Sequence, residues 1–132
     1  MANDKSAARP LSPHLQIYRP MLTMMMSIMH RITGVGLYFG MVLLVWWLTA
    51  ASVSDSYFEF VQGFFGQWFG RLLLFGFTWA LIHHALGGLR HLLWDTGRGF
   101  DLNLIEWLAR ANLAGSIVLT LLLWVIGYGV MA

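Results

Sequence analysis

Two long stretches without a charged side chain most constrain the fold of this chain. Residues 32–53 and 111–132 contain no Asp, Glu, Lys or Arg. Each has roughly the twenty residues that a helix needs to cross the hydrocarbon core of a bilayer. Only 11% of the 132 residues are charged, whereas a soluble domain has about 25%. The sequence therefore predicts an all-α membrane protein without a separate soluble enzyme domain.

The apolar pattern predicts three transmembrane helices, at about 21–50, 67–93 and 104–130. They form one membrane-anchor domain of residues 21–132, preceded by a polar, cytoplasmic N-terminal segment of residues 1–20. The connector at 51–66 contains four phenylalanines and is expected to form a short helix on the membrane surface. The third transmembrane helix carries no obvious chemistry, and we expect it to provide packing surface.

The distribution of Lys and Arg predicts the orientation. Basic residues occur in and just after the N-terminal segment and around the loop at 94–106, whereas the connector at 51–66 has none. By the positive-inside rule, the N-terminus and the second loop are cytoplasmic and the C-terminus is on the opposite side.

Composition also excludes several classes of site. The chain has no cysteine, which rules out disulfides, Cys-ligated zinc or iron–sulfur centres and thioether-linked haem on this chain, but not non-covalent haem. The net charge of +2 without a basic run gives no reason to expect a nucleic-acid partner. The N-terminus lacks the features of a cleaved signal peptide and is expected to be retained.

One face of the second transmembrane helix carries ionisable groups. At about 100° per residue, His84, Gly88, His91 and Asp95 share that face. Such groups are costly inside a membrane and are functional candidates. A neutral imidazole can ligate haem iron. His84 is therefore either an axial haem ligand or a histidine that hydrogen-bonds a neighbouring helix.

The adjacent histidine belongs to a different face. His83 lies about 100° from His84 around the helix, so we expect it to hydrogen-bond elsewhere or to lie at the lipid interface. Small-residue spacing also occurs twice, at Gly36 and Gly40 and at Gly66 and Gly70, and it permits close approach of helices.

The first transmembrane helix has its own polar stripe. Ser27, His30, Arg31 and Gly34 follow helical spacing. His30 and Arg31 lie about as far from the cytoplasmic end of this helix as His84 lies from the cytoplasmic end of the second. The two stretches should therefore meet at one depth.

Buried haem would need partners for its propionates. Arg31, His30 and His91 can supply charge-assisted hydrogen bonds. Alternatively, Arg31 pairs with Asp95 in a purely structural salt bridge.

Two multi-residue motifs resemble those of the cytochrome b556 subunits of succinate dehydrogenase. They are Arg9-Pro10-Leu11 with Ser27-Ile28-Met29-His30-Arg31-Ile32-Thr33, and residues 84–97, HALGGLRHLLWDTG. They occur in the order and at the distance typical of the family, and the resemblance covers residues 9–130.

This resemblance implies a heterodimeric anchor helix bundle in the bacterial inner membrane. A second anchor subunit would supply the other histidine to one shared haem b. A flavoprotein subunit would oxidise succinate, and an iron–sulfur subunit would pass electrons to ubiquinone near the cytoplasmic face. The chain itself would carry no residue for succinate oxidation.

The resemblance also implies roles for individual residues. His84 would be the axial ligand of the haem iron, and His30 would lie beside the haem and its propionates. Ser27 and Arg31 would line the quinone pocket. The end of the second motif would serve propionate, quinone-site and subunit contacts through Arg90, His91 and Asp95.

Two other functions fit the sequence. The chain would be a haem-free structural anchor if its histidines only pack and dock other subunits. It would be a self-contained b-type cytochrome if His30 and His84 were both axial ligands, which their shared depth allows.

Overall fold

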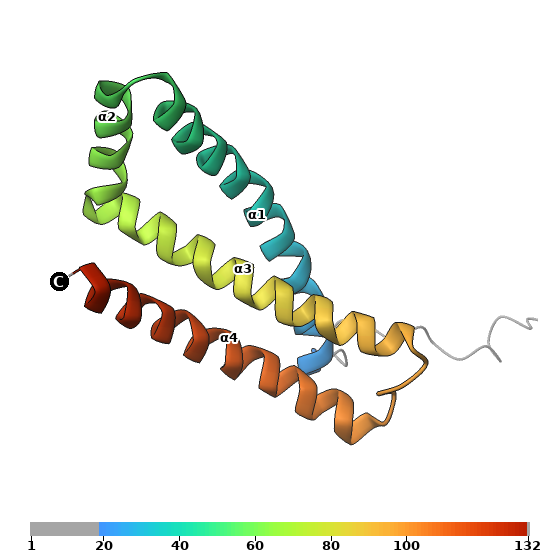
Figure 1. Cartoon of the computed structure of the whole chain (residues 1–132). Coiled ribbons are helices and arrows are strands. Elements are labelled where there is room, and N and C mark those ends of the chain that lie inside the picture. Colours follow the sequence, from blue (N-terminus) through green and yellow to red (C-terminus); the bar gives the residue numbers. More distant parts are fainter. Residues whose placement is uncertain (1–18, 132) are drawn as a thin grey trace, which may run out of the picture.

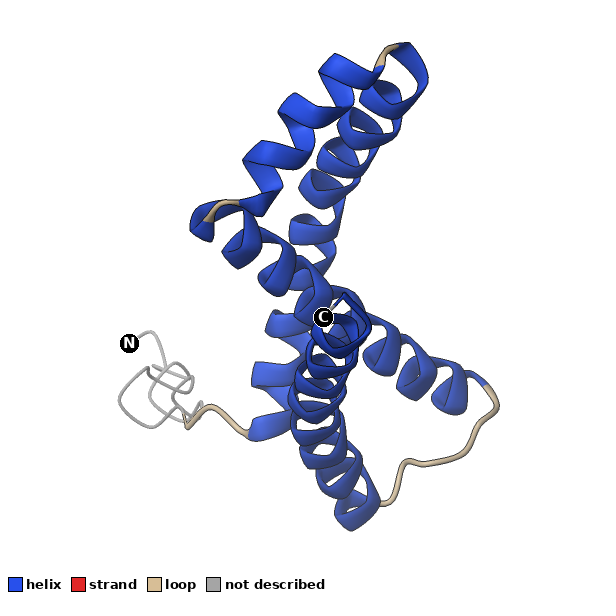
Figure 2. Cartoon of the chain, turned by 60° about the vertical axis from the view of Figure 1, so that its left-hand side comes forward, coloured by secondary structure: helices blue, strands red, loops and turns tan. Residues whose placement is uncertain are grey.

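The computed structural model describes residues 19–131. Most of the N-terminal segment, with Arg9-Pro10-Leu11, lies outside these described residues. Within them the chain forms helices and no strand (Figures 1 and 2). The helices are, in order, α1 (Leu22–Val53), α2 (Asp55–Gly66), α3 (Trp68–Asp95) and α4 (Leu102–Met131).

Three of these helices, α1, α3 and α4, are long and apolar enough to cross a membrane. The all-α membrane fold with three spanning helices is thereby confirmed. The expected spans are 21–50, 67–93 and 104–130. The helices α1 and α3 each begin one residue later and end a few residues later than expected, and α4 extends beyond its expected span at both ends.

The helix α3 is central to the arrangement. Figure 1 shows α3 and α4 running side by side as an antiparallel hairpin. In the same view α1 meets α3 near the N-terminal end of α1 and diverges from it toward α2, which closes the gap between them. The close contact between α1 and α3 is therefore concentrated in the part of α1 that holds the polar stripe.

The connector contains the short helix expected from its phenylalanines. The hydroxyl of Ser54 accepts a hydrogen bond from the Tyr57 N–H at 3.3 Å and caps the helix. Val61 and Phe65 are buried and pack with Ala50 of α1. The indole of Trp46 donates to the Tyr57 hydroxyl at 2.8 Å. The helix α2 is therefore fixed to the C-terminal end of α1.

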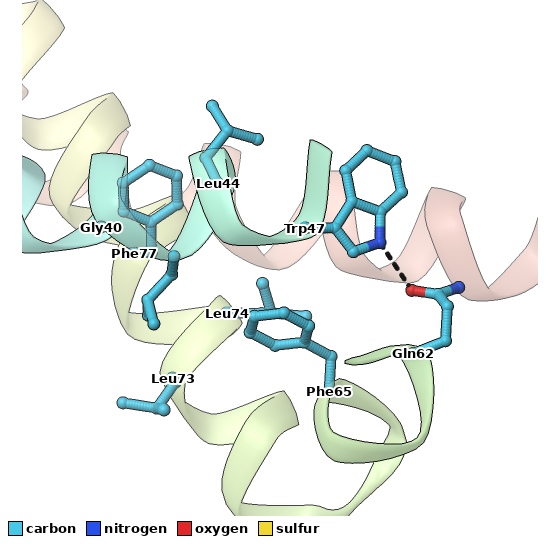
Figure 3. Close-up of a pocket in the computed structure, with 9 residues that line it drawn as sticks. Gly40, Leu44, Trp47, Gln62, Phe65, Leu73, Leu74 and Phe77 are labelled. Carbon is cyan, nitrogen blue, oxygen red and sulfur yellow. Dashed lines mark hydrogen bonds between the residues drawn. The ribbon is translucent and has the colours of Figure 1, made fainter. Parts of the chain in front are cut away.

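An apolar cavity of about 310 Å³ lies between α1, α2 and α3, in the region where α1 and α3 have diverged (Figure 3). At its edge the Trp47 indole donates to the Gln62 side-chain oxygen at 2.8 Å. Its lining residues are Gly40, Leu43, Leu44, Trp47, Gln62, Phe65, Leu73, Leu74 and Phe77. This cavity lies beside the C-terminal half of α1, away from its polar stripe.

Only one glycine of each expected pair lies at a helix contact. A Cβ atom at Gly40 would overlap the ring of Phe77, and one at Gly70 would overlap the backbone of Phe64 and Phe65. A Cβ atom at Gly36 or Gly66 would meet no atom within 4 Å among the described residues. The small-residue spacing therefore marks single points of close approach.

We predict that Gly40→Ala destabilises the protein, because the new methyl group overlaps Phe77. Overpacking of this kind costs about 1–3 kcal/mol. Gly36→Ala is the matched control, and we expect it to be neutral or slightly stabilising, because alanine is the better helix former. Thermal unfolding of the detergent-purified protein measures both effects, and equal midpoints for the two variants would contradict this packing.

Candidate functional site

Histidines from α1 and α3 form one cluster. The rings of His30 and His84 stack at 3.9 Å between centroids and 7° between planes. His91 lies next to them, with its ring 5.2 Å from that of His30. The polar stretches of the two helices therefore meet, as their similar depth predicts.

The ring of His84 is held by groups of α1. Its Nδ1 atom lies 3.1 Å from the main-chain oxygen of His30 and 3.3 Å from Oγ1 of Thr33. The Thr33 hydroxyl lies 2.9 Å from the main-chain oxygen of Met29, to which it can donate. The sequence analysis named Thr33 only as a member of the first motif and assigned it no role. Its contact with His84 is visible only in the structure.

Glycines make room for both stacked rings. A Cβ atom at Gly34 would lie 3.1 Å from Cε1 of His84, and one at Gly87 would lie 2.5 Å from Nδ1 of His30. Gly88 differs, because a Cβ atom there would meet nothing within 4 Å among the described residues. The His84 face of α3 therefore has open space one turn beyond the histidine.

His83 points to the opposite helix, α4. It is fully buried, and its Nδ1 atom lies 3.1 Å from Oγ of Ser116. Its ring centroid lies 5.1 Å from that of Trp79. Of the two alternatives for His83, the hydrogen bond away from His84 is confirmed, and the position at the lipid interface is wrong, because His83 is fully buried.

Arg90 also faces α4 and not the His84 face. Its side chain is only 7% exposed, and its guanidinium carbon lies 5.0 Å from the ring centroid of Trp94. Arg90 and Asn112 both line a cavity of about 280 Å³ between α3 and α4. The residues of the second motif are thus divided between two sides of α3.

The side of α4 that faces α3 carries a buried polar row that the sequence reading missed. Asn112, Ser116 and Thr120 are all buried. They follow one another at intervals of four, so they lie on one face of the helix. This spacing was a signal in the sequence, and the prediction of a helix without chemistry overlooked it.

Four of the expected site residues lie on the surface of the chain. They are Ser27, Arg31, His91 and Asp95. The alternative salt bridge between Arg31 and Asp95 is wrong, since the one salt bridge among residues 19–131 joins Glu106 and Arg110 at 2.5 Å. Ser27 and Arg31 are one turn apart and lie on one side of α1.

The family model of the succinate dehydrogenase/fumarate reductase transmembrane subunit matches residues 5–123. The chain belongs to this family. The resemblance of the two motifs is therefore confirmed, and the chain is a multi-pass membrane subunit of the succinate dehydrogenase type.

Individual relatives agree with this assignment. The succinate dehydrogenase cytochrome b556 subunit of Paracoccus denitrificans is 45% identical over 122 residues, which are 92% of this chain and 94% of that protein. The b556 subunit of Rickettsia conorii is 38% identical over 89% of this chain and 91% of its own length. The succinate dehydrogenase cytochrome b560 subunit of Marchantia polymorpha is 41% identical over 72% of this chain and 73% of its own length.

We predict that Ser116→Ala lowers the stability of this succinate dehydrogenase-type subunit. The change removes the partner of a buried imidazole nitrogen, which costs about 1–3 kcal/mol. Thermal unfolding of the purified protein measures the effect. Ser52→Ala is the control, because the Ser52 hydroxyl is exposed and donates only to the Thr49 carbonyl of its own helix. Equal midpoints for these variants would show that the His83 contact contributes nothing.

Proposed function

We propose that this chain is the membrane-anchor cytochrome b subunit of a succinate dehydrogenase. In this proposal it shares one haem b with a second anchor subunit and forms part of the site where ubiquinone is reduced. The family membership and the names of the relatives support the general assignment. The finer roles depend mainly on the way in which His84 is held.

The hydrogen bonds of His84 support its role as an iron ligand. A main-chain carbonyl accepts hydrogen bonds and cannot donate them, so the contact with the His30 oxygen at 3.1 Å requires a proton on Nδ1 of His84. Nε2 then carries a lone pair, which is the form of imidazole that binds a metal. Haem-ligating histidines are commonly oriented by such a bond from the other ring nitrogen. This hydrogen bond is the observation on which the proposal rests.

The surroundings of His84 also fit a porphyrin. Gly88 lies one turn along the same face, where a Cβ atom would meet nothing within 4 Å among the described residues. Bound haem would supply one-electron transfer chemistry. His84 would fix the position of the iron, and Thr33 would limit rotation of the imidazole through its 3.3 Å contact.

The geometry disfavours a self-contained cytochrome. The rings of His30 and His84 stack directly at 3.9 Å, which leaves no room for a flat cofactor between them. Both rings therefore cannot bind one iron in this arrangement. A second anchor subunit would provide the other histidine, and His30, Arg31 and His91 of this chain would bind propionates.

Ser27, Arg31 and Asp95 would serve the quinone. A hydroxyl and a guanidinium one turn apart can donate to a quinone oxygen as negative charge develops on it. Asp95 is exposed at the end of α3, where it can pass protons from water. Electrons would arrive from the iron–sulfur subunit after the flavoprotein has oxidised succinate.

The proposed location is the bacterial inner membrane, with the N-terminus in the cytoplasm. The loop between α3 and α4 contains Arg98, whereas α2 and its flanking residues contain no Lys or Arg between Val53 and Gly70. This asymmetry supports the orientation. In this proposal the quinone residues lie on the cytoplasmic side, where the soluble subunits would dock.

We predict that His84→Leu abolishes the low-spin haem spectrum of the purified complex, because leucine has no lone pair for iron. The absorbance spectrum and the haem-to-protein ratio measure the loss. The adjacent His83→Asn is the matched control and should retain haem, since His83 faces α4. A normal spectrum in His84→Leu would refute the ligand assignment, and a wild-type complex without haem would favour the structural-anchor alternative.

We predict that Arg31→Ala reduces succinate–ubiquinone activity by about 100- to 1000-fold, as expected for loss of a donor to a developing oxyanion. Oxidation of succinate with an artificial dye acceptor should stay unchanged, because it does not use the quinone site. Arg71→Ala, which changes an exposed arginine near the N-terminal end of α3, is the control and should affect neither activity. Equal loss of both activities in Arg31→Ala would instead indicate failed assembly.

A further inference from the structure

Two oxygen atoms of α1 lie close to the same nitrogen of His84. The main-chain oxygen of His30 lies 3.1 Å from Nδ1 of His84, and Oγ1 of Thr33 lies 3.3 Å from the same atom. Thr33 is only 3% exposed, and it follows His30 by less than one helical turn. One turn of α1 therefore presents a main-chain acceptor and a side-chain hydroxyl to the N–H group of His84.

The direction of the Thr33 hydroxyl follows from the oxygens around it. Its Oγ1 atom lies 2.9 Å from the main-chain oxygen of Met29 and 3.0 Å from that of His30. A carbonyl oxygen has two lone pairs. At His30, one lone pair accepts the Gly34 N–H of the helix and the other accepts the N–H of His84. At Met29 the helix uses one lone pair, for the N–H of Thr33, so the other accepts the hydroxyl proton.

A hydroxyl that donates to Met29 can only accept from His84. Its single proton is used, and its lone pairs remain available to the Nδ1–H group. That N–H is then shared between two acceptors, in a three-centre hydrogen bond. Gly34 permits this approach, because a Cβ atom there would lie 3.1 Å from Cε1 of His84.

We propose that Thr33 is a positioning residue that makes the imidazole of His84 a stronger donor to iron and thereby lowers the midpoint potential of the haem. The inference rests on the proposed function, because it takes His84 to be the axial ligand. Each acceptor at Nδ1–H draws this proton away from the ring and leaves more negative charge on Nε2. A stronger donor stabilises ferric over ferrous iron, because the ferric ion carries the larger positive charge. Hydrogen bonds to an axial ligand are one means by which a protein sets a haem potential.

The test is a redox titration of the complete complex, followed by the haem absorbance. Thr33→Val keeps the shape of the side chain but removes the hydroxyl, so the midpoint potential should rise. Thr33→Ser keeps the hydroxyl and should retain the wild-type potential. Thr120→Val is the matched control, because Thr120 is also buried but its hydroxyl donates to the Ser116 main-chain oxygen within α4, at 2.7 Å. This control should leave the potential unchanged.

The hydrogen bond itself can be measured by solid-state NMR of the reduced complex labelled with ¹⁵N-histidine. The His84 signal is the one that disappears in His84→Leu. In Thr33→Val the Nδ1–H proton of His84 should move upfield, because one of its two acceptors is lost. A proton shift equal to that of the wild type would show that Thr33 accepts no hydrogen bond from His84.

An unchanged potential in Thr33→Val, or an equal rise in Thr33→Val and Thr33→Ser, would overturn the inference. If Thr33→Val does not assemble, Thr33→Cys is compared with Thr33→Ser. These variants differ only in the atom that faces His84, and sulfur is the weaker acceptor, so the cysteine variant should have the higher potential. Equal potentials would overturn the inference. Absence of haem from the wild-type complex would instead refute the proposed function, whereas the NMR shift would still report the hydrogen bond to Thr33.

Discussion

The hydrogen bond between His84 and the main-chain oxygen of His30 is the interaction on which the site depends. The hydrocarbon core offers no water to an imidazole, so the ring must find its partners within the protein. A main-chain oxygen is a rigid partner because the helix backbone holds it. The bond, 3.1 Å long, joins α1 to α3 and determines which nitrogen of His84 stays free. One contact thereby sets both helix packing and the chemistry of the ring.

The helix α3 separates two polar environments. The side that faces α1 carries His84 and His91, whereas the side that faces α4 carries His83 and Arg90. Neighbouring residues in the sequence thus serve different helices, because each step along a helix turns the side chain by about 100°. At Gly87 the two environments approach each other, since α3 has no side chain there to keep α1 and α4 apart.

The sequence predicted the features that depend on how deep a residue lies in the membrane. It failed for features that depend on the rotation and tilt of each helix. The absence of charged residues located the spanning helices. The similar depth of His30 and His84 predicted that the two residues meet. Depth alone could not show that Arg90 turns toward α4, or that Arg31 and Asp95 remain apart. The glycine spacing was also ambiguous, because α1 diverges from α3 and, of Gly36 and Gly40, only Gly40 lies against a neighbouring side chain. The spacing of Asn112, Ser116 and Thr120 at intervals of four could have predicted that they share one face of α4. Their side chains carry no charge, so nothing in the sequence indicated a function for them.

The exposure of Arg31 has a consequence for the isolated chain. The side chain belongs to a helix that crosses the bilayer, and no salt bridge within residues 19–131 neutralises it. A guanidinium in the hydrocarbon core costs up to about 2.5–3.5 kcal/mol on the lower scales, the value at the centre of the bilayer. A copy of the chain without partner subunits would therefore bear the free-energy cost of a charged side chain in lipid. Assembly with a partner would remove this cost.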